Sequence, residues 1–142
     1  MQIYNEYPWP PSALSPNARL HWTKRNPVKA KYREGCAKVT RHAELVREWL
    51  EHEEEAGVSL DTSGALLDTT WIGVAIQFVP PDRRWRDVDN LVASCKPLLD
   101  GMCRRLGVND RMLWPLLVRP PRGPERDARV EVTLYFGELI EI

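Results

Sequence analysis

The segment TTWIGVAIQFV (residues 69–79) constrains the fold more than any other stretch of the sequence. Its β-branched and aromatic residues favour a strand. Two prolines, Pro80 and Pro81, follow it and end the strand. No apolar run in the chain approaches the roughly 18 residues that a membrane-spanning helix needs. The segment is therefore predicted to be a strand of a soluble domain.

Three further strands are predicted from weaker patterns. The segment RVEVTLYF alternates cleanly over Arg129–Phe136, as expected for a strand with one buried face. Another strand is expected near the N-terminus, ending at Pro10-Pro11, and a fourth over Met112–Val118, where Pro115 weakens the pattern. The residues predicted to share the buried face of the segment 129–136 are Val130, Val132, Leu134 and Phe136.

Two helices are predicted between these strands. A long helix is expected from Pro27 to about Ala56, with Asn26 as its cap and Gly57 placed to stop it. A second helix is expected between Asn90 and Leu106, stopped by Gly107. The polar stretch from Val58 to Asp68 is expected to be a loop or hairpin tip. Residues that recur every three or four positions form the buried stripe of the first helix: Val28, Tyr32, Cys36, Val39, Ala43, Val46 and Leu50.

Length and composition fit one α+β domain over residues 1–142, with a small mixed sheet and two main helices. Hydrophobic residues make up 43% of the chain and charged residues 28%. The N-terminus has no pattern typical of a signal peptide, so a cytoplasmic location is expected. Three cysteines without a CxxC pair favour small buried residues over a disulfide framework or zinc site: Cys36, Cys95 and Cys103.

The formal net charge is zero, but the charges are separated along the chain. Between Ser15 and His42 there are eight Lys or Arg against one acid, and between Glu44 and Asp61 seven acids against one base. Such a chain can offer a basic face to a polyanion while staying neutral overall. Six basic residues of this segment are candidates for contacts with DNA phosphates, and the alternative is that they form a solvated helix face. They are Arg19, Lys24, Arg25, Lys29, Lys31 and Arg33.

The stretch RDVDN (residues 86–90) carries the strongest chemical signal. Either acid, or Asn90, could simply cap the following helix. Two acids one residue apart can instead converge on a hard cation such as Mg²⁺, which prefers oxygen ligands. A third acid, Asp110, can join Asp87 and Asp89 if the chain turns back after the helix or if a second chain completes the geometry.

Basic and aromatic residues surround these acids. Lys96 can stabilise charge on a phosphate, or it can form a solvated pair with Asp100 four residues on. Trp85 can stack on an unpaired base or serve as a buried anchor. His21 could touch DNA, although a surface role fits it better, and no histidine pair has metal spacing. The arginines that supply phosphate-facing charge here are Arg83, Arg84 and Arg86.

The segments PPDRRWRDVDNLVASCKPLLDG and LGVNDR resemble the RusA family of Holliday junction resolvases. NARLHWTKR, KAKYRE and the strand RVEVTLYF are similar to that family in the same order, so the likeness spans most of the chain. The resemblance implies a compact α+β homodimer that binds four-way DNA junctions. It also implies that paired nicks are made with Mg²⁺ or Mn²⁺.

By position in the motif, the resemblance assigns Asp87, Asp89 and Asp110 as metal ligands. Asn90 matches the motif amide, and Asn109 stands where the family has a further acid. The family's lysine usually lies four residues beyond the second acid, where this chain has Ala93. Lys96 is the best candidate here, since position i+7 returns to the same helix face. Pro97 implies that this helix either kinks there or starts later with Ser94 as its cap.

The leading hypothesis is a Mg²⁺-dependent, structure-selective endodeoxyribonuclease that resolves four-way junctions in recombination and repair. Catalysis would use Asp87, Asp89, Lys96 and Asp110, with a metal-bound water attacking phosphorus. One alternative is a non-catalytic protein that binds branched DNA, motivated by Asn109 and the displaced lysine. Another is a nuclease for flaps or forks. No P-loop motif is present, so no ATP-driven step or nucleotide cofactor is expected. No membrane partner is expected either, since no apolar run is long enough to span a bilayer.

Overall fold

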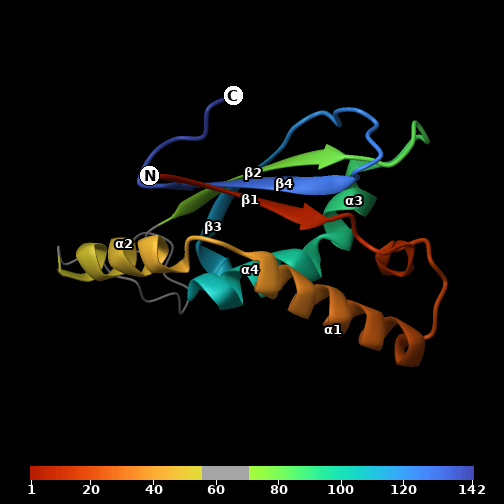
Figure 1. The fold of residues 1–142 in the computed structure, drawn as a ribbon, viewed down its shortest axis with the longest axis horizontal. Coiled ribbons are helices and arrows are strands. Elements are labelled where there is room, and N and C mark those ends of the chain that lie inside the picture. Colours follow the sequence, from red (N-terminus) through yellow and green to blue (C-terminus); the bar gives the residue numbers. More distant parts are fainter. Residues whose placement is uncertain (56–70) are drawn as a thin grey trace.

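A computed structural model describes residues 1–55 and 71–142, and it contains one four-stranded mixed sheet with helices (Figure 1). The strands lie in the order β1-β4-β2-β3. Strand β4 is antiparallel to both of its neighbours, whereas β2 and β3 run parallel. The predicted mixed α+β fold is therefore confirmed. The bounds of the strands are β1 Gln2–Pro8, β2 Ile72–Val79, β3 Leu113–Val118 and β4 Arg129–Phe136.

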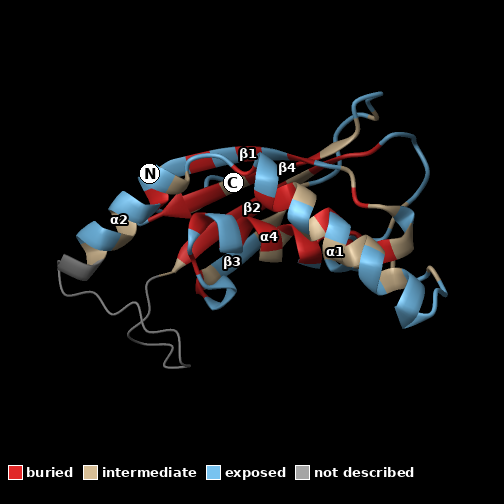
Figure 2. Cartoon of the chain, turned by 60° about the horizontal axis from the view of Figure 1, so that its bottom comes forward, coloured by how far each residue is buried: buried red, intermediate tan, exposed pale blue. Residues whose placement is uncertain are grey.

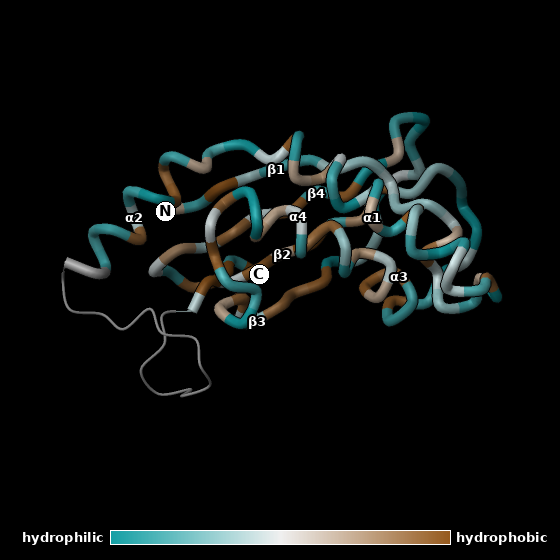
Figure 3. Tube along the Cα trace, turned by 90° about the horizontal axis from the view of Figure 1, so that it is seen from below, coloured by the Kyte–Doolittle hydropathy of each residue, from teal (hydrophilic) through white to brown (hydrophobic). Residues whose placement is uncertain are grey.

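Strands β2 and β4 form the centre of the sheet because both of their faces are apolar or covered. The face predicted to be buried in β4 is buried, with Val130, Val132, Leu134 and Phe136. Glu131 and Tyr135 on the other face are buried as well, so β4 is not a strand with one exposed face. Strand β2 is buried over nearly its whole length (Figure 2). Both β2 and the neighbouring edge strand β3 are largely hydrophobic (Figure 3). Pro115 is tolerated in β3 because an edge strand needs backbone partners on one side only.

The prediction of one long helix from Pro27 to Ala56 is wrong. Two helices replace it, α1 (Trp22–Val39) and α2 (Ala43–Glu55). Helix α1 starts five residues before Pro27, with His21 rather than Asn26 as its cap, and the His21 Nδ1 accepts a hydrogen bond from the Thr23 amide at 3.3 Å. Pro27 is thus accommodated inside α1. Val39, predicted for the buried stripe, is exposed.

The break between α1 and α2 has a tertiary cause. The Thr40 hydroxyl donates to the Cys36 carbonyl at 2.8 Å and bonds the Tyr7 hydroxyl at 2.9 Å. The buried side chain of Asn5 accepts from the Arg41 amide at 2.8 Å, which satisfies backbone that a continuous helix would otherwise use. His42 then takes a left-handed backbone conformation with φ of 76°.

The second predicted helix is present but divided. Helices α3 (Val88–Ser94) and α4 (Lys96–Leu106) meet at Cys95, which is the N-cap residue of α4 in place of the expected Ser94. Pro97 lies in the first turn of α4, where a proline removes no helical hydrogen bond. Gly107 ends α4 with φ of 73°, as predicted. Two short 3₁₀ helices complete the set, η1 (Ser12–Leu14) and η2 (Asp110–Met112).

Helices α1 and α4 pack on one another and cover one face of the sheet (Figure 1). Gly101 of α4 makes this close approach possible, because a Cβ there would lie 2.3 Å from the Arg33 carbonyl oxygen of α1. Cys36, Cys95 and Cys103 are free and buried in this layer, as predicted. None of the described helices is both long and apolar enough to cross a membrane. The predicted loop from Val58 to Asp68 and the helix end at Ala56 lie outside the described residues.

Candidate functional site

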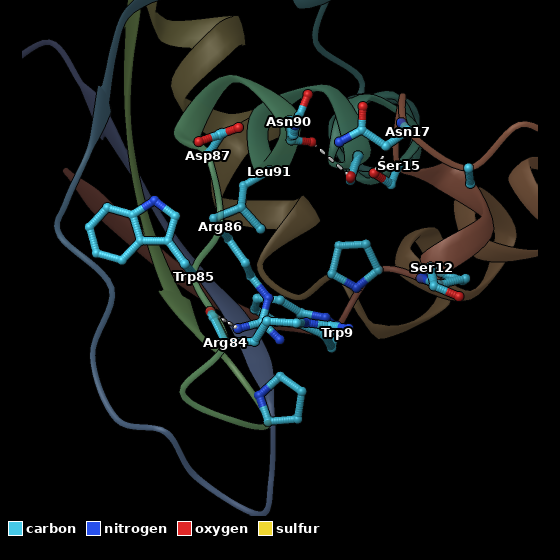
Figure 4. A pocket seen from close by; sticks show the side chains of 15 residues that line it. Trp9, Ser12, Ser15, Asn17, Arg84, Trp85, Arg86, Asp87, Asn90 and Leu91 are labelled. Carbon is cyan, nitrogen blue, oxygen red and sulfur yellow. Dashed lines mark hydrogen bonds between the residues drawn. The ribbon is translucent and has the colours of Figure 1, made fainter.

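A cleft of about 580 Å³ opens beside the N-terminus of α3. Arg84, Trp85 and Asp87 lie along one wall, and the segment from Ser12 to Ala18 lies across from them (Figure 4). The Trp85 side chain is 91% exposed, so it is no buried anchor. Its predicted alternative role, stacking on a base, is compatible with this exposure. Other residues that line the cleft are Trp9, Asn17, Pro81, Arg86, Asn90, Leu91 and Ser94.

Asp87 occupies the N-cap position of α3, but its side chain does not cap the helix. Its backbone carbonyl accepts from the Leu91 amide at 3.1 Å, whereas its carboxylate makes no hydrogen bond or ion pair with any described residue. Among residues 1–55 and 71–142, the Asp89 carboxylate accepts only the neighbouring Asn90 amide, at 3.0 Å. The Asp87 side chain thus does not cap α3, and it is exposed at the edge of the cleft, as a solvated loop residue or an open ligand would be.

The chain does turn back after α4, and it brings Asp110 to Lys96. The Lys96 ammonium donates to Asp110 Oδ2 at 2.9 Å and pairs with Asp100 Oδ1 at 3.1 Å. The predicted i,i+4 pair with Asp100 is thus confirmed, together with a second partner. The hydrogen bond from Lys96 lowers the pKa of the Asp110 carboxyl, and the same bond raises the pKa of Lys96. The Lys96 ammonium thus lies between two carboxylates, on a side chain that is 56% exposed.

Asn109 has a structural role in this turn. It caps η2, because its side-chain oxygen accepts the Arg111 amide at 3.0 Å. Asn90 lies in α3 and also has a structural contact, since its backbone carbonyl accepts the Ser94 hydroxyl at 2.8 Å. Because it accepts the Arg111 amide, the side-chain oxygen of Asn109 is partly occupied.

The donor types fit a hard cation, because Asp87, Asp89 and Asp110 all offer carboxylate oxygens. Their arrangement fits less well. Across residues 1–55 and 71–142, no three or more His, Cys, Asp or Glu side chains are grouped closely enough to hold a metal ion. Asp110 is engaged by Lys96 instead of meeting Asp87 and Asp89. The three-carboxylate site stays a prediction.

The Arg86 side chain contacts other residues of the protein and is not directed to solvent alone. Its guanidinium bonds Asp82 Oδ1 at 2.9 Å and lies 5.4 Å from the centre of the Trp9 ring. Two backbone carbonyls of the same loop, at Asp82 and Arg84, accept from it as well. Arg86 therefore holds the loop that presents Trp85. Sequence reasoning missed Trp9 and Asp82 as its partners, although the acid four residues before Arg86 was a usable signal. Arg83 and Arg84 are exposed.

The basic residues of the N-terminal third divide into two groups. Arg19, Lys24 and Lys31 are exposed, as a solvated face or a phosphate contact would be. Arg25, Lys29 and Arg33 recur every four residues on α1 and are half-buried. Among them, Arg25 donates to the Ala18 carbonyl at 2.7 Å and the Ser15 carbonyl at 3.4 Å. Arg25 thus holds the segment that forms the far wall of the cleft.

Comparison with known proteins gives a relative without a functional description. No family model matches the chain. The chain is 38% identical over 104 residues to a protein of Xylella fastidiosa (strain Temecula1 / ATCC 700964) described as an uncharacterized protein. The match covers 73% of this chain and 58% of that protein. The chain therefore spans little more than half the length of this relative.

Proposed function

We propose that this protein is a Mg²⁺- or Mn²⁺-dependent endodeoxyribonuclease of the RusA type that acts on branched DNA, with four-way junctions as its first substrate. One observation carries the proposal. The Asp87 carboxylate, without a partner among the described residues, lines a cleft beside the exposed Trp85 and the cation Arg84. An available carboxylate, an aromatic face and a basic group suit a site that holds a phosphodiester next to an unstacked base.

Asp87 and Asp89 would hold the cation in this proposal. When bound, the metal would lower the pKa of a coordinated water and neutralise charge that develops on the phosphate. A third ligand, Asp110, would come from a second copy, because within one chain Asp110 pairs with Lys96. Paired nicks on a symmetric junction need two symmetric sites, which is the reason for proposing a homodimer. A cytoplasmic, nucleoid-associated location belongs to the same proposal.

The deciding experiment is nicking of a synthetic four-way junction with Mg²⁺ and with Mn²⁺. Wild-type protein should cleave, and Asp87→Asn should lose cleavage while it keeps its melting temperature. Asp127→Asn is the matched control, because Asp127 is 91% exposed and lines neither cleft described for this protein. Cleavage that survives in Asp87→Asn would refute the assignment of this site.

A mixing experiment tests the second copy. If Asp110 acts across a dimer, inactive Asp89→Asn and inactive Asp110→Asn proteins should regain partial activity when they are mixed and allowed to exchange subunits. Activity that stays absent in the mixture, with exchange verified by light scattering, would refute a site shared between two copies.

A second candidate function is a non-catalytic protein that binds branched DNA. Two observations favour it: Lys96 pairs with two carboxylates, and Asn109 caps η2. Both side chains are then engaged in structural contacts and are less available for metal binding or catalysis. Tight binding of junctions without metal, and no nicking with either metal by wild-type protein, would establish this alternative. A panel of junctions, flaps and forks at matched salt separates a resolvase from a flap or fork nuclease.

A further inference from the structure

A second cleft, of about 540 Å³, lies between α1 and the junction of α3 with α4. Its polar lining consists of three cations, Arg25, Lys29 and Lys96. Apolar side chains and prolines supply the rest, among them Leu14 and Leu99, and none of the described lining residues is an acid. An apolar cleft with only cationic polar groups is complementary to an anion that carries an apolar or planar part.

The three cations are not equally available. Lys96 forms ion pairs with Asp100 and Asp110, and Arg25 donates hydrogen bonds to the carbonyls of Ser15 and Ala18. Lys29 is half-buried, and its ammonium makes no hydrogen bond or ion pair with any described residue. Of the three cations, Lys29 is the one not already engaged by a described partner. Lys29 is therefore the group with the most to gain from a bound anion.

The second cleft adjoins the cleft of Asp87. The segment 12–18 lines both clefts, since Ser15 and Asn17 face the first cleft and Leu14 and Pro16 the second. Helix α3 is also shared, with Asn90 lining the first cleft and Val92 the second. A chain molecule with regularly spaced anionic groups can therefore occupy both clefts by crossing this segment.

We propose that the second cleft binds a backbone phosphate of a nucleic-acid strand, with Lys29 as its main contact, while the adjoining sugar or base rests on the apolar wall. The volume is in the usual range for a site that takes a ligand of nucleotide size. Identification of the strand as DNA rests on the proposed function, whereas the phosphate site itself does not. The site continues the strand beyond the cleft of Asp87.

The test measures binding of a fluorescein-labelled single-stranded oligodeoxynucleotide by anisotropy over a series of KCl concentrations, in EDTA. Each phosphate contact contributes about 0.7 to the slope of log Kd against log salt for single strands. Lys29→Gln should lower the slope by about that amount and weaken binding several-fold at low salt. Lys38→Gln is the matched control, because Lys38 is exposed on the same helix and lines neither cleft. Equal slopes for Lys29→Gln and wild type would overturn the proposal.

A second variant protects the test against misfolding. Lys29→Arg keeps the charge and should bind like wild type, so a loss confined to Lys29→Gln assigns the effect to charge. Inorganic phosphate at matched ionic strength is the competing probe. It should displace the oligonucleotide from wild type at concentrations that leave Lys29→Gln binding unaffected. Equal displacement from both proteins would overturn the assignment of the phosphate to this cleft. EDTA suppresses cleavage, so failure of the nuclease proposal leaves this result interpretable.

Discussion

The Lys96 ammonium donates a hydrogen bond to the Asp110 carboxylate at 2.9 Å, and this contact joins the first turn of α4 to the short helix that follows it. The two residues are fourteen positions apart in the chain. The pair lies where the chain returns toward β3, and Lys96 also lines the second cleft. Its consequences can be measured directly.

The pair should contribute to stability in a way that depends on pH. Hydrogen bonding from Lys96 lowers the pKa of Asp110 below its ordinary value of about 3.9. A lowered folded-state pKa gives stabilisation that is complete above the unfolded value and is lost as the pH falls through the folded one. Asp110→Asn should thus cost less than about 1 kcal/mol near pH 7, because the pair is exposed. The difference from wild type should disappear in acid.

Urea unfolding between about pH 7 and pH 2 provides the measurement. Glu48→Gln is the control, because Glu48 is exposed and its side chain makes no hydrogen bond or ion pair with a described residue. A cost of Asp110→Asn that stays constant down to the lowest pH would show that the ion pair is not its source.

Gly101→Ala should separate α1 from α4. The new Cβ would lie 2.3 Å from the Arg33 carbonyl oxygen, and a backbone atom cannot move aside alone. We expect the free energy of unfolding to fall by about 1–3 kcal/mol, as for other overpacked cores. Gly35→Ala is the matched change on α1, where nothing lies within 4 Å of the added Cβ. It should raise stability by up to about 1 kcal/mol, since alanine favours the helix.

Thermal or urea unfolding of both glycine variants checks this pair of predictions. Their effects should have opposite signs. Two variants that destabilise equally would contradict the role of the close approach at Gly101.

Trp85→Ala should weaken binding of branched or single-stranded DNA without lowering stability. The side chain is 91% exposed, so its removal leaves no cavity. Loss of one stacked base costs about 1–3 kcal/mol, which corresponds to a roughly 5- to 150-fold increase in Kd. Trp114→Ala changes another exposed tryptophan, on the edge strand β3, and should leave Kd unchanged. Anisotropy titrations of the two variants at equal salt would contradict the stacking role if both bind like wild type.

The three cysteines should be unreactive in the folded protein. Burial raises the pKa of the Cys36 thiol to about 11 and those of Cys95 and Cys103 to about 12. Because the thiolate is the reactive form, labelling by Ellman's reagent at pH 8 should be negligible until denaturant is added. All three thiols should then react. Rapid labelling of the native protein would show that the layer of α1 and α4 opens.

The sequence by itself determined the elements whose patterns are local. The strands β2 and β4, the stop at Gly107 and the burial of the cysteines could all be predicted, because alternation, glycine geometry and apolar size act over a few residues. The break at Thr40 could not. It depends on Asn5 of β1, which is 36 positions from Arg41 in the chain and meets it only through the tertiary structure.

The same distinction holds for the site. Sequence identified Asp87 and Lys96 as residues to examine, because their types and spacing are informative in one dimension. Only the tertiary structure decided that Asp87 lines a cleft, that Trp85 is exposed, and that Asp110 pairs with Lys96. Long-range pairing of charges is set by where the bend at Cys95 and the turn at Gly107 direct the chain, and side-chain spacing along a helix does not contain that information.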